Sequence, residues 1–238
     1  MANGVLIFKG MKVGVLPGDF SISVNKSGEH ESKLILSTAY NVVPLWLRIA
    51  HDSLKQSKIA SESVTEMWDE NTDNQKELLM AELAPSMQVF VSCGIGLDAL
   101  HDTLRPYAKI SLQEIEAWRK NKTSRAKQIV EILRRTHKLQ SDVLSNFSKC
   151  ISQIIKYRDT AVHPSLELKN ACTRPDVQVG VDWKFSAYRF SNAEWCLTNT
   201  INMVVYLYEH KSGTKEVDES ISNIVDTLEE LKVVQHSA

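Results

Sequence analysis

The segment 151–164 of the chain, ISQIIKYRDTAVHP, combines residue types that suit acid–base chemistry on a phosphate ester. On a helical wheel the apolar residues from Val143 onward form one stripe, and Arg158 falls near its centre. A buried arginine needs an anionic or hydrogen-bonding partner. We therefore expect the helix that carries Arg158 to face another helix and not bulk water.

Asp159 and His163 are four residues apart, so a carboxylate and an imidazole can meet on one flank of this helix. Such a pair would orient the imidazole and raise its basicity, and Pro164 would end the helix directly after it. Cleavage of RNA by its own 2′-hydroxyl needs a base for that proton and a cation for charge on the phosphate. His163 and Arg158 could supply both without a metal. The alternative is an ordinary helix C-terminus where both side chains favour the macrodipole.

The pattern Arg158-Asp159-x-x-x-His163 resembles the R-x4-H signature of HEPN domains, in which a polar residue commonly follows the arginine. Residues 86–104 are similar to the opening helix of those domains, and residues 190–210 to the closing helix. Asp98 falls where many members carry an acidic residue, which makes it a candidate supporting acid. The resemblance covers about residues 85–210.

The resemblance implies a fold, an activity and partners. Similar proteins are all-α bundles that form homodimers, bring two R-x4-H motifs into one cleft, and often cleave RNA without a metal or other cofactor. Many act in toxin–antitoxin or antiviral systems, so a protein inhibitor or antitoxin is an implied partner. In some toxin members the antitoxin modifies a tyrosine two residues after the histidine, but Ser165 stands there in this chain. Other members only bind RNA or serve as scaffolds, which is the alternative function.

Charge is segregated along the chain although its formal sum is −1. Residues 117–138 hold eight basic residues and one acid, whereas residues 216–231 hold six acids and no base. A dense basic stretch predicts contact with a phosphate backbone, and the alternative is a solvated helix face. The residues predicted to bind the RNA backbone are Arg119, Lys120, Lys122, Arg125, Lys127, Arg134, Arg135 and Lys138.

The composition of the 238 residues, 43% hydrophobic and 24% charged, is that of a globular protein and not of a disordered chain. No apolar run approaches the ~20 residues of a membrane span, and no secretory signal opens the chain, so we expect a cytoplasmic protein without a membrane partner. Four cysteines without a CxxC pair predict neither a zinc site nor a disulfide framework.

Periodicity predicts a mainly α protein, an antiparallel HEPN-like helical bundle with a small N-terminal β-hairpin and one accessory strand. The hairpin pairs residues 13–15 with 20–24 through a turn at Leu16–Asp19. The accessory strand is 177–185, which could pair with the hairpin. As one domain, the chain divides into a β extension (1–33), the bundle (34–212) and an acidic C-terminal helix (213–238).

Helix boundaries follow from capping signals and prolines. Pro44 either kinks the first helix or opens a second one, Pro85 begins an apolar helix, and Ser111 with Glu114 forms a capping box. Ser191 with Glu194 is a second capping box. The expected helices are 34–58, 62–70, 74–84, 85–105, 112–138, 139–161 and 191–208, followed by a tail with a heptad seam at Val217, Ile221, Ile224, Leu228 and Leu231.

Three other patterns each allow a functional and a structural interpretation. Gly94-x-Gly96 after an apolar run could be a dinucleotide loop, or small residues for close helix packing. The pairs His51-Asp52 and His101-Asp102 are typical of metal-dependent phosphohydrolases but lack further ligands at workable spacing. Aromatic residues at helical or alternating spacing could stack on bases or fill the core; they are Trp183, Trp195, Tyr188, Tyr206 and Tyr208.

Overall fold

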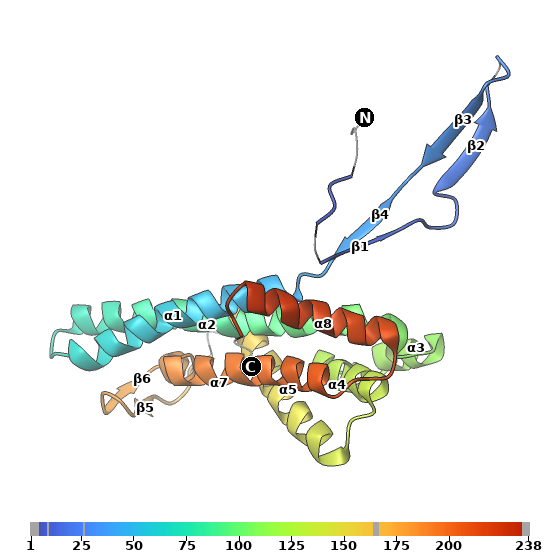
Figure 1. The fold of residues 1–238 in the computed structure, drawn as a ribbon. Helices are drawn as coiled ribbons and strands as arrows, with labels where there is room; N and C mark the ends of the chain where they lie inside the picture. Colours follow the sequence, from blue (N-terminus) through green and yellow to red (C-terminus); the bar gives the residue numbers. More distant parts are fainter. Residues whose placement is uncertain (1–4, 9, 26, 164–166, 235–238) are drawn as a thin grey trace. The chain divides into compact units, whose positions relative to one another are not determined.

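The computed structural model describes residues 5–8, 10–25, 27–163 and 167–234. The chain divides into two compact units, a β unit over residues 1–41 and a helical unit over residues 42–238 (Figure 1). The β part therefore ends at residue 41 and not at residue 33, because a fourth strand follows the expected hairpin.

Four short strands form two antiparallel pairs in the β unit, β1 with β4 and β2 with β3. Their bounds are Met11–Gly14 (β1), Phe20–Val24 (β2), His30–Leu34 (β3) and Ser37–Tyr40 (β4). The chain reverses between β2 and β3, where the Asn25 side chain accepts hydrogen bonds from the N–H groups of Ser27 and Glu29, both at 2.9 Å. Gly28 there has φ +81°, a left-handed conformation that glycine adopts without strain.

The expected pairing of residues 13–15 with 20–24 is wrong, because β1 and β2 have other partners. The turn at Leu16–Asp19 does form: the Asp19 N–H donates to the Leu16 carbonyl at 2.9 Å, and Gly18 has φ +92°. It links β1 to β2 while only two residues, 35–36, link β3 to β4. A Pro-Gly turn can connect two strands that do not pair as well as two that form a hairpin. Its presence therefore does not determine which strands pair.

Within the described residues, the helical unit holds eight α-helices, one 3-10 turn and one strand pair. The helices are α1 (Val43–Glu66), α2 (Thr72–Leu104), α3 (Leu112–Lys120), α4 (Arg125–His137), α5 (Ser141–Val162), α6 (Trp183–Ala187), α7 (Phe190–Glu209) and α8 (Lys215–Glu230), with the 3-10 turn at Arg105–Tyr107 and strands β5 (Cys172–Arg174) and β6 (Val179–Val181). The prediction of a mainly helical protein with a minor β part is confirmed, but the described strands form three antiparallel pairs and not one hairpin with an accessory strand.

The first two helices are longer than local signals indicate. Pro44 lies in the first turn of α1, which confirms that it opens a helix. The expected helix start at residue 34 is wrong because β4 intervenes, and the expected break between 58 and 62 is absent. Pro85 lies inside α2 and does not begin a helix. Because α2 packs against α1, α4, α5 and α7, its burial outweighs the hydrogen bond that Pro85 removes.

The helix expected over 112–138 is two helices. The Ser111–Glu114 capping box is confirmed at the start of α3. Lys122 has φ +48°, a left-handed conformation that ends the helical path after α3. Ser124 then caps α4, its hydroxyl accepting from the Lys127 N–H at 3.4 Å. This break places the N-terminus of α4 beside α5.

The second expected capping box is wrong: α7 begins at Phe190 without a side-chain cap from its N-cap residue. Glu82 of α2 accepts the Phe190 N–H at 2.7 Å instead. The accessory strand is also shorter than expected, because Asp182 caps α6 by accepting from the Lys184 N–H at 2.9 Å. What remains, β6, pairs with β5 and not with the N-terminal strands.

The C-terminal helix α8 docks on α7 and α1 (Figure 1). Four of the five seam residues, Val217, Ile221, Ile224 and Leu228, are buried as the heptad spacing predicts, whereas Leu231 is the C-cap residue of α8 and is only partly buried. The α2 segment Thr72–Tyr107 is long and apolar enough, by length and composition, to cross a membrane. Half of its most apolar window is buried inside the helical unit, where α2 contacts α1, α4, α5, α6 and α7.

Candidate functional site

Arg158 lies where α5 packs against α2. A Cβ added to Gly94 of α2 would lie 2.6 Å from Arg158 Cγ, so the arginine stem requires a glycine opposite it. Its guanidinium donates to Asp98 Oδ2 through Nη1 at 2.5 Å and to Asp159 Oδ1 through Nε at 2.7 Å. The expectation that Arg158 faces a helix is confirmed, and that helix belongs to the same chain.

The Arg158–Asp98 pair is part of a longer chain of charges. Asp98 also accepts from Arg125 Nε at 2.7 Å, and Arg125 Nη2 donates to Asp102 at 3.2 Å. Asp102 is hydrogen-bonded to Nδ1 of the buried His101 at 2.7 Å. Burial lowers the pKa of Arg158, but the hydrogen bonds and charges of Asp98 and Asp159 together outweigh burial and raise that pKa above its ordinary value. We call the side chains of Asp98, Asp102, Arg125 and Arg158 the ion-pair network.

His163 is the C-cap residue of α5 and is exposed. Its N–H donates to the Asp159 carbonyl at 2.9 Å, but among the described residues no side-chain hydrogen bond joins it to Asp159. The expected carboxylate–imidazole pair is therefore not formed. His163 has φ −124° and ψ 66°, outside helical geometry, and the Asp159 carboxylate is taken by Arg158. Pro164, expected to end the helix, and Ser165 lie outside the described residues.

An open cleft of about 650 Å³ lies along the C-terminal half of α5. Asp159 and His163 line it together with two lysines, Lys156 and Lys169, and one aromatic ring, Trp183. The first turn of α4 completes the wall with Ser124 and Ala126. Within the described part of the chain, neither lysine has an ion-pair partner. A helix N-terminus and two unpaired ammonium groups make this cleft a favourable place for an anion. Arg158 is not among its lining residues.

Sequence reasoning missed Lys156 and Lys169 as parts of the site, and it named Trp183 only as an aromatic residue that could stack on bases or fill the core. For α5 a signal exists: the cleft-lining residues repeat at the spacing of one helix face, and they are Ser152, Lys156, Asp159, Thr160 and His163. Lys169 and Trp183 follow after a loop and a strand pair. No local sequence pattern predicts that Lys169 and Trp183 lie beside α5.

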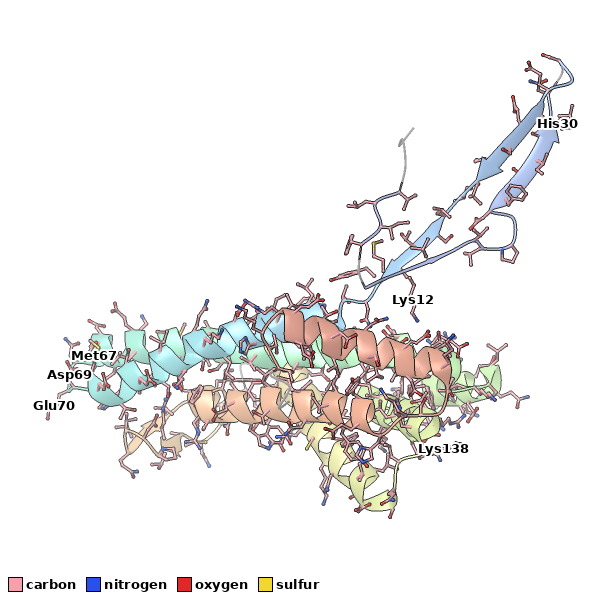
Figure 2. All side chains as sticks on the ribbon, in the orientation of Figure 1. Lys12, His30, Met67, Asp69, Glu70 and Lys138 are labelled. Carbon is pink, nitrogen blue, oxygen red and sulfur yellow. The ribbon has the colours of Figure 1, made fainter. Side chains whose placement is uncertain are left out.

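The eight basic residues of 117–138 separate into two groups. Three arginines are compensated: Arg125 by the ion-pair network, Arg134 by Glu131, and Arg135 by Glu131 and Glu114. The others are exposed and have no ion pair among the residues that the structure describes; they are Arg119, Lys120, Lys122, Lys127 and Lys138. Figure 2 shows Lys138 at the connection between α4 and α5.

In the described chain, the glycine pair, the His-Asp pairs and the cysteines do not form functional sites of the kinds considered from the sequence. Gly94 and Gly96 lie inside α2, which rules out a strand–loop–helix dinucleotide site and supports close packing. In the described ranges, no group of three or more His, Cys, Asp or Glu side chains is placed to hold a metal ion. Asp52 is held by Arg48 at 2.7 Å. The cysteines are free; they are Cys93, Cys150, Cys172 and Cys196.

No protein-family model, curated protein or solved structure matches this chain. Any assignment of function must therefore come from the chemistry of the cleft and of the ion-pair network.

Proposed function

We propose that the protein is a metal-independent endoribonuclease of HEPN type, acting in the cleft that Asp159 and His163 line. One observation supports this most strongly: the R-x4-H segment ends at a cleft where an exposed imidazole stands among uncompensated cations. These are the groups that RNA cleavage by an internal 2′-hydroxyl requires.

In this mechanism His163 accepts the proton of the 2′-hydroxyl as the 2′ oxygen attacks phosphorus. The bond from phosphorus to the 5′ oxygen breaks, and that oxygen takes a proton, which leaves a 2′,3′-cyclic phosphate and a 5′-hydroxyl. Lys156 and Lys169 bind the phosphate whose charge grows during the attack. Arg158 acts as a positioning residue, because its guanidinium holds Asp159 at the cleft wall while Asp98 holds the guanidinium.

The proposal includes a homodimer. One imidazole cannot at the same moment accept the 2′ proton and donate a proton to the 5′ oxygen. Two-fold symmetry would bring the α5 ends of two copies around one groove, so that one His163 acts as base and the other as acid. RNA and a second copy of the chain are the proposed partners.

The test is incubation of the purified protein with a mixture of RNAs in EDTA, followed by analysis of the fragment ends. We expect cyclic-phosphate and 5′-hydroxyl ends. Intact RNA, or 5′-phosphate ends, would contradict the proposal, because the latter require attack by water or by a metal-bound hydroxide.

A second candidate, a non-catalytic RNA-binding or scaffold protein, is favoured by a different observation. Arg158 is only 14% exposed and is compensated by two carboxylates of its own chain, as a structural arginine would be. This candidate predicts salt-dependent RNA binding, or binding of another macromolecule, with no cleavage in either the presence or the absence of metal ions.

A further inference from the structure

We infer that the side pocket between Trp183 and Tyr157 binds one unstacked nucleobase of single-stranded RNA. The inference rests on the proposed function for the identity of the polymer. It adds a binding subsite, and it gives a role to an aromatic residue that the cleavage chemistry does not use.

The pocket opens from the cleft. A second cavity of about 310 Å³ is lined by Lys156, Tyr157, Thr160, Lys169 and Trp183. All of these residues except Tyr157 also line the larger cleft. Trp183 thus lines both cavities, together with Lys156, Thr160 and Lys169. A strand whose phosphate contacts the lysines in the cleft can direct the adjacent base into the side pocket.

The walls of this pocket are fixed by aromatic packing. Trp183 contacts Tyr188 with ring centroids 6.3 Å apart, and Tyr157 contacts Tyr188 edge-on at 5.7 Å. Tyr157 is also stacked on Phe90 at 5.0 Å. The buried Tyr188 hydroxyl donates to the Tyr157 carbonyl at 2.8 Å, which ties α5 to the end of α6. A rigid aromatic wall gains stacking energy without losing side-chain entropy on binding.

Two lysines make cation–π contacts with the ring of Trp183. The Lys169 Nζ lies 4.7 Å from the ring centroid and the Lys184 Nζ lies 5.4 Å from it. Lys184 is anchored by Asp182 at 3.8 Å, whereas Lys169 has no ion pair among the described residues. In the proposed complex the base takes the place of Lys169 on the ring, because no ion pair in the described ranges holds Lys169 there, and the freed ammonium group binds the adjacent phosphate. Base stacking and phosphate binding are coupled through this one side chain.

The site combines the two kinds of group that bind an unpaired nucleotide. Proteins that bind single-stranded nucleic acid combine aromatic stacking surfaces with cations that follow the backbone, and both lie here within one pair of connected cavities. RNA is read in this way when its bases are splayed out of the helix. The site therefore requires an unpaired strand and not a duplex.

The test uses the full-length His163→Ala protein in EDTA, so that binding is measured without cleavage. Affinities for 12-nucleotide oligoadenylate and oligouridylate, and for a 12-base-pair RNA duplex, are compared by fluorescence titration. We expect tighter binding of oligoadenylate because purines stack more strongly, with quenching of tryptophan emission. Adding Trp183→Leu, which keeps an apolar side chain, should weaken oligoadenylate binding about tenfold and remove the base preference. Adding Trp183→Phe should retain part of both.

Trp68 provides the matched control. It lies in the turn between α1 and α2, where Figure 2 labels its sequence neighbours Met67 and Asp69, and it lines neither cavity. Trp68→Leu should leave affinity and base preference unchanged. An unchanged adenylate preference in the Trp183→Leu protein would overturn the pocket and leave the proposed function standing. Failure of the His163→Ala protein to bind any RNA would overturn both.

Discussion

The ion-pair network and the cleft both include residues of α4 and α5 but differ in how their charges are compensated. In the network each guanidinium has two carboxylate contacts, and each of these arginines is at least two-thirds buried. In the cleft Lys156, Lys169 and His163 have no ion pair in the part of the chain that the structure describes. Compensated charges hold helices together, whereas uncompensated charges remain available to a ligand. Residues 117–138 carry eight basic residues and one acid, a local net charge of +7. Because three of these arginines are already compensated, the charge that is available to bind RNA is smaller than that sum.

The largest effect should come from the most deeply buried pair, Arg174 with Glu82, both 1% exposed. Arg174→Met leaves the Glu82 carboxylate buried without its partner, so we expect a loss of about 3–5 kcal/mol in the free energy of unfolding. Urea unfolding measures it. The double variant with Glu82→Met should lose less than the single one. A single variant within 1 kcal/mol of wild type would contradict the division between structural and available charges.

The buried His137 tests the opposite case, a titratable group without an ion-pair partner among the described residues. Burial lowers the pKa of His137 from the ordinary 6.5 to about 4, although Asp218 opposes this. The folded state then binds the proton less readily than the unfolded state. The contribution of His137 is complete above pH 6.5 and decreases as the pH falls to 4, by about 2–3 kcal/mol.

Urea unfolding at pH 7.5 and pH 4.5 measures this dependence. Burial also lowers the pKa of His101, so part of the loss should persist when His137 is replaced. The His137→Gln protein should show a clearly smaller decrease between the two pH values. An identical decrease would show that His137 is not buried in its neutral form.

The crossing of α5 and α2 gives a smaller effect with a matched control. Gly94→Ala places a methyl group 2.6 Å from Arg158 Cγ and 2.8 Å from its Cβ, which the backbone must relieve. We expect a loss of about 1–2 kcal/mol in thermal or urea unfolding. Gly96→Ala meets Leu47 at an ordinary 3.4 Å and should be neutral or slightly stabilising, because alanine favours helix. Equal effects of the two substitutions would mean that Arg158 is not held at this crossing.

The smallest effect on stability, and the sharpest on RNA binding, should come from the cleft lysines. Lys156→Ala and Lys169→Ala remove exposed cations, so unfolding should change by less than about 0.5 kcal/mol. Each should reduce the slope of log Kd against log salt by about one unit. Arg134→Ala with Arg135→Ala should reduce the slope less, because Glu131 and Glu114 already compensate these arginines. A larger reduction from the arginine pair would reverse the assignment of the RNA surface.

Local signals in the sequence predict the features that depend on neighbouring residues. They are the capping box at Ser111, the end of α5 next to His163, the buried seam of α8, and the burial of Arg158 in an apolar stripe. Each depends on contacts within a few residues, or on a helix face that must be covered by some other helix. The sequence does not predict which helix covers that face.

Features that depend on distant partners could not be predicted. The strand pair β1–β4 joins Met11 to Tyr40 although a Pro-Gly turn lies between them, and the Arg174–Glu82 pair spans 92 residues. The same limit applies to the site. Only the fold brings Lys169 and Trp183 to α5 and gives the Asp159 carboxylate to Arg158 and not to His163.

The most direct test of the proposed activity compares wild-type and His163→Ala proteins on one single-stranded RNA in EDTA. Wild type should produce 2′,3′-cyclic phosphate ends, and the variant should be at least about 100-fold slower, the contribution of a positioned base. His30→Ala, a control on β3 (Figure 2), should cleave at the wild-type rate. The free energy of unfolding should be nearly the same in all three proteins. Equal cleavage rates for wild type and His163→Ala, or no cleavage by wild type, would contradict the proposed catalytic role.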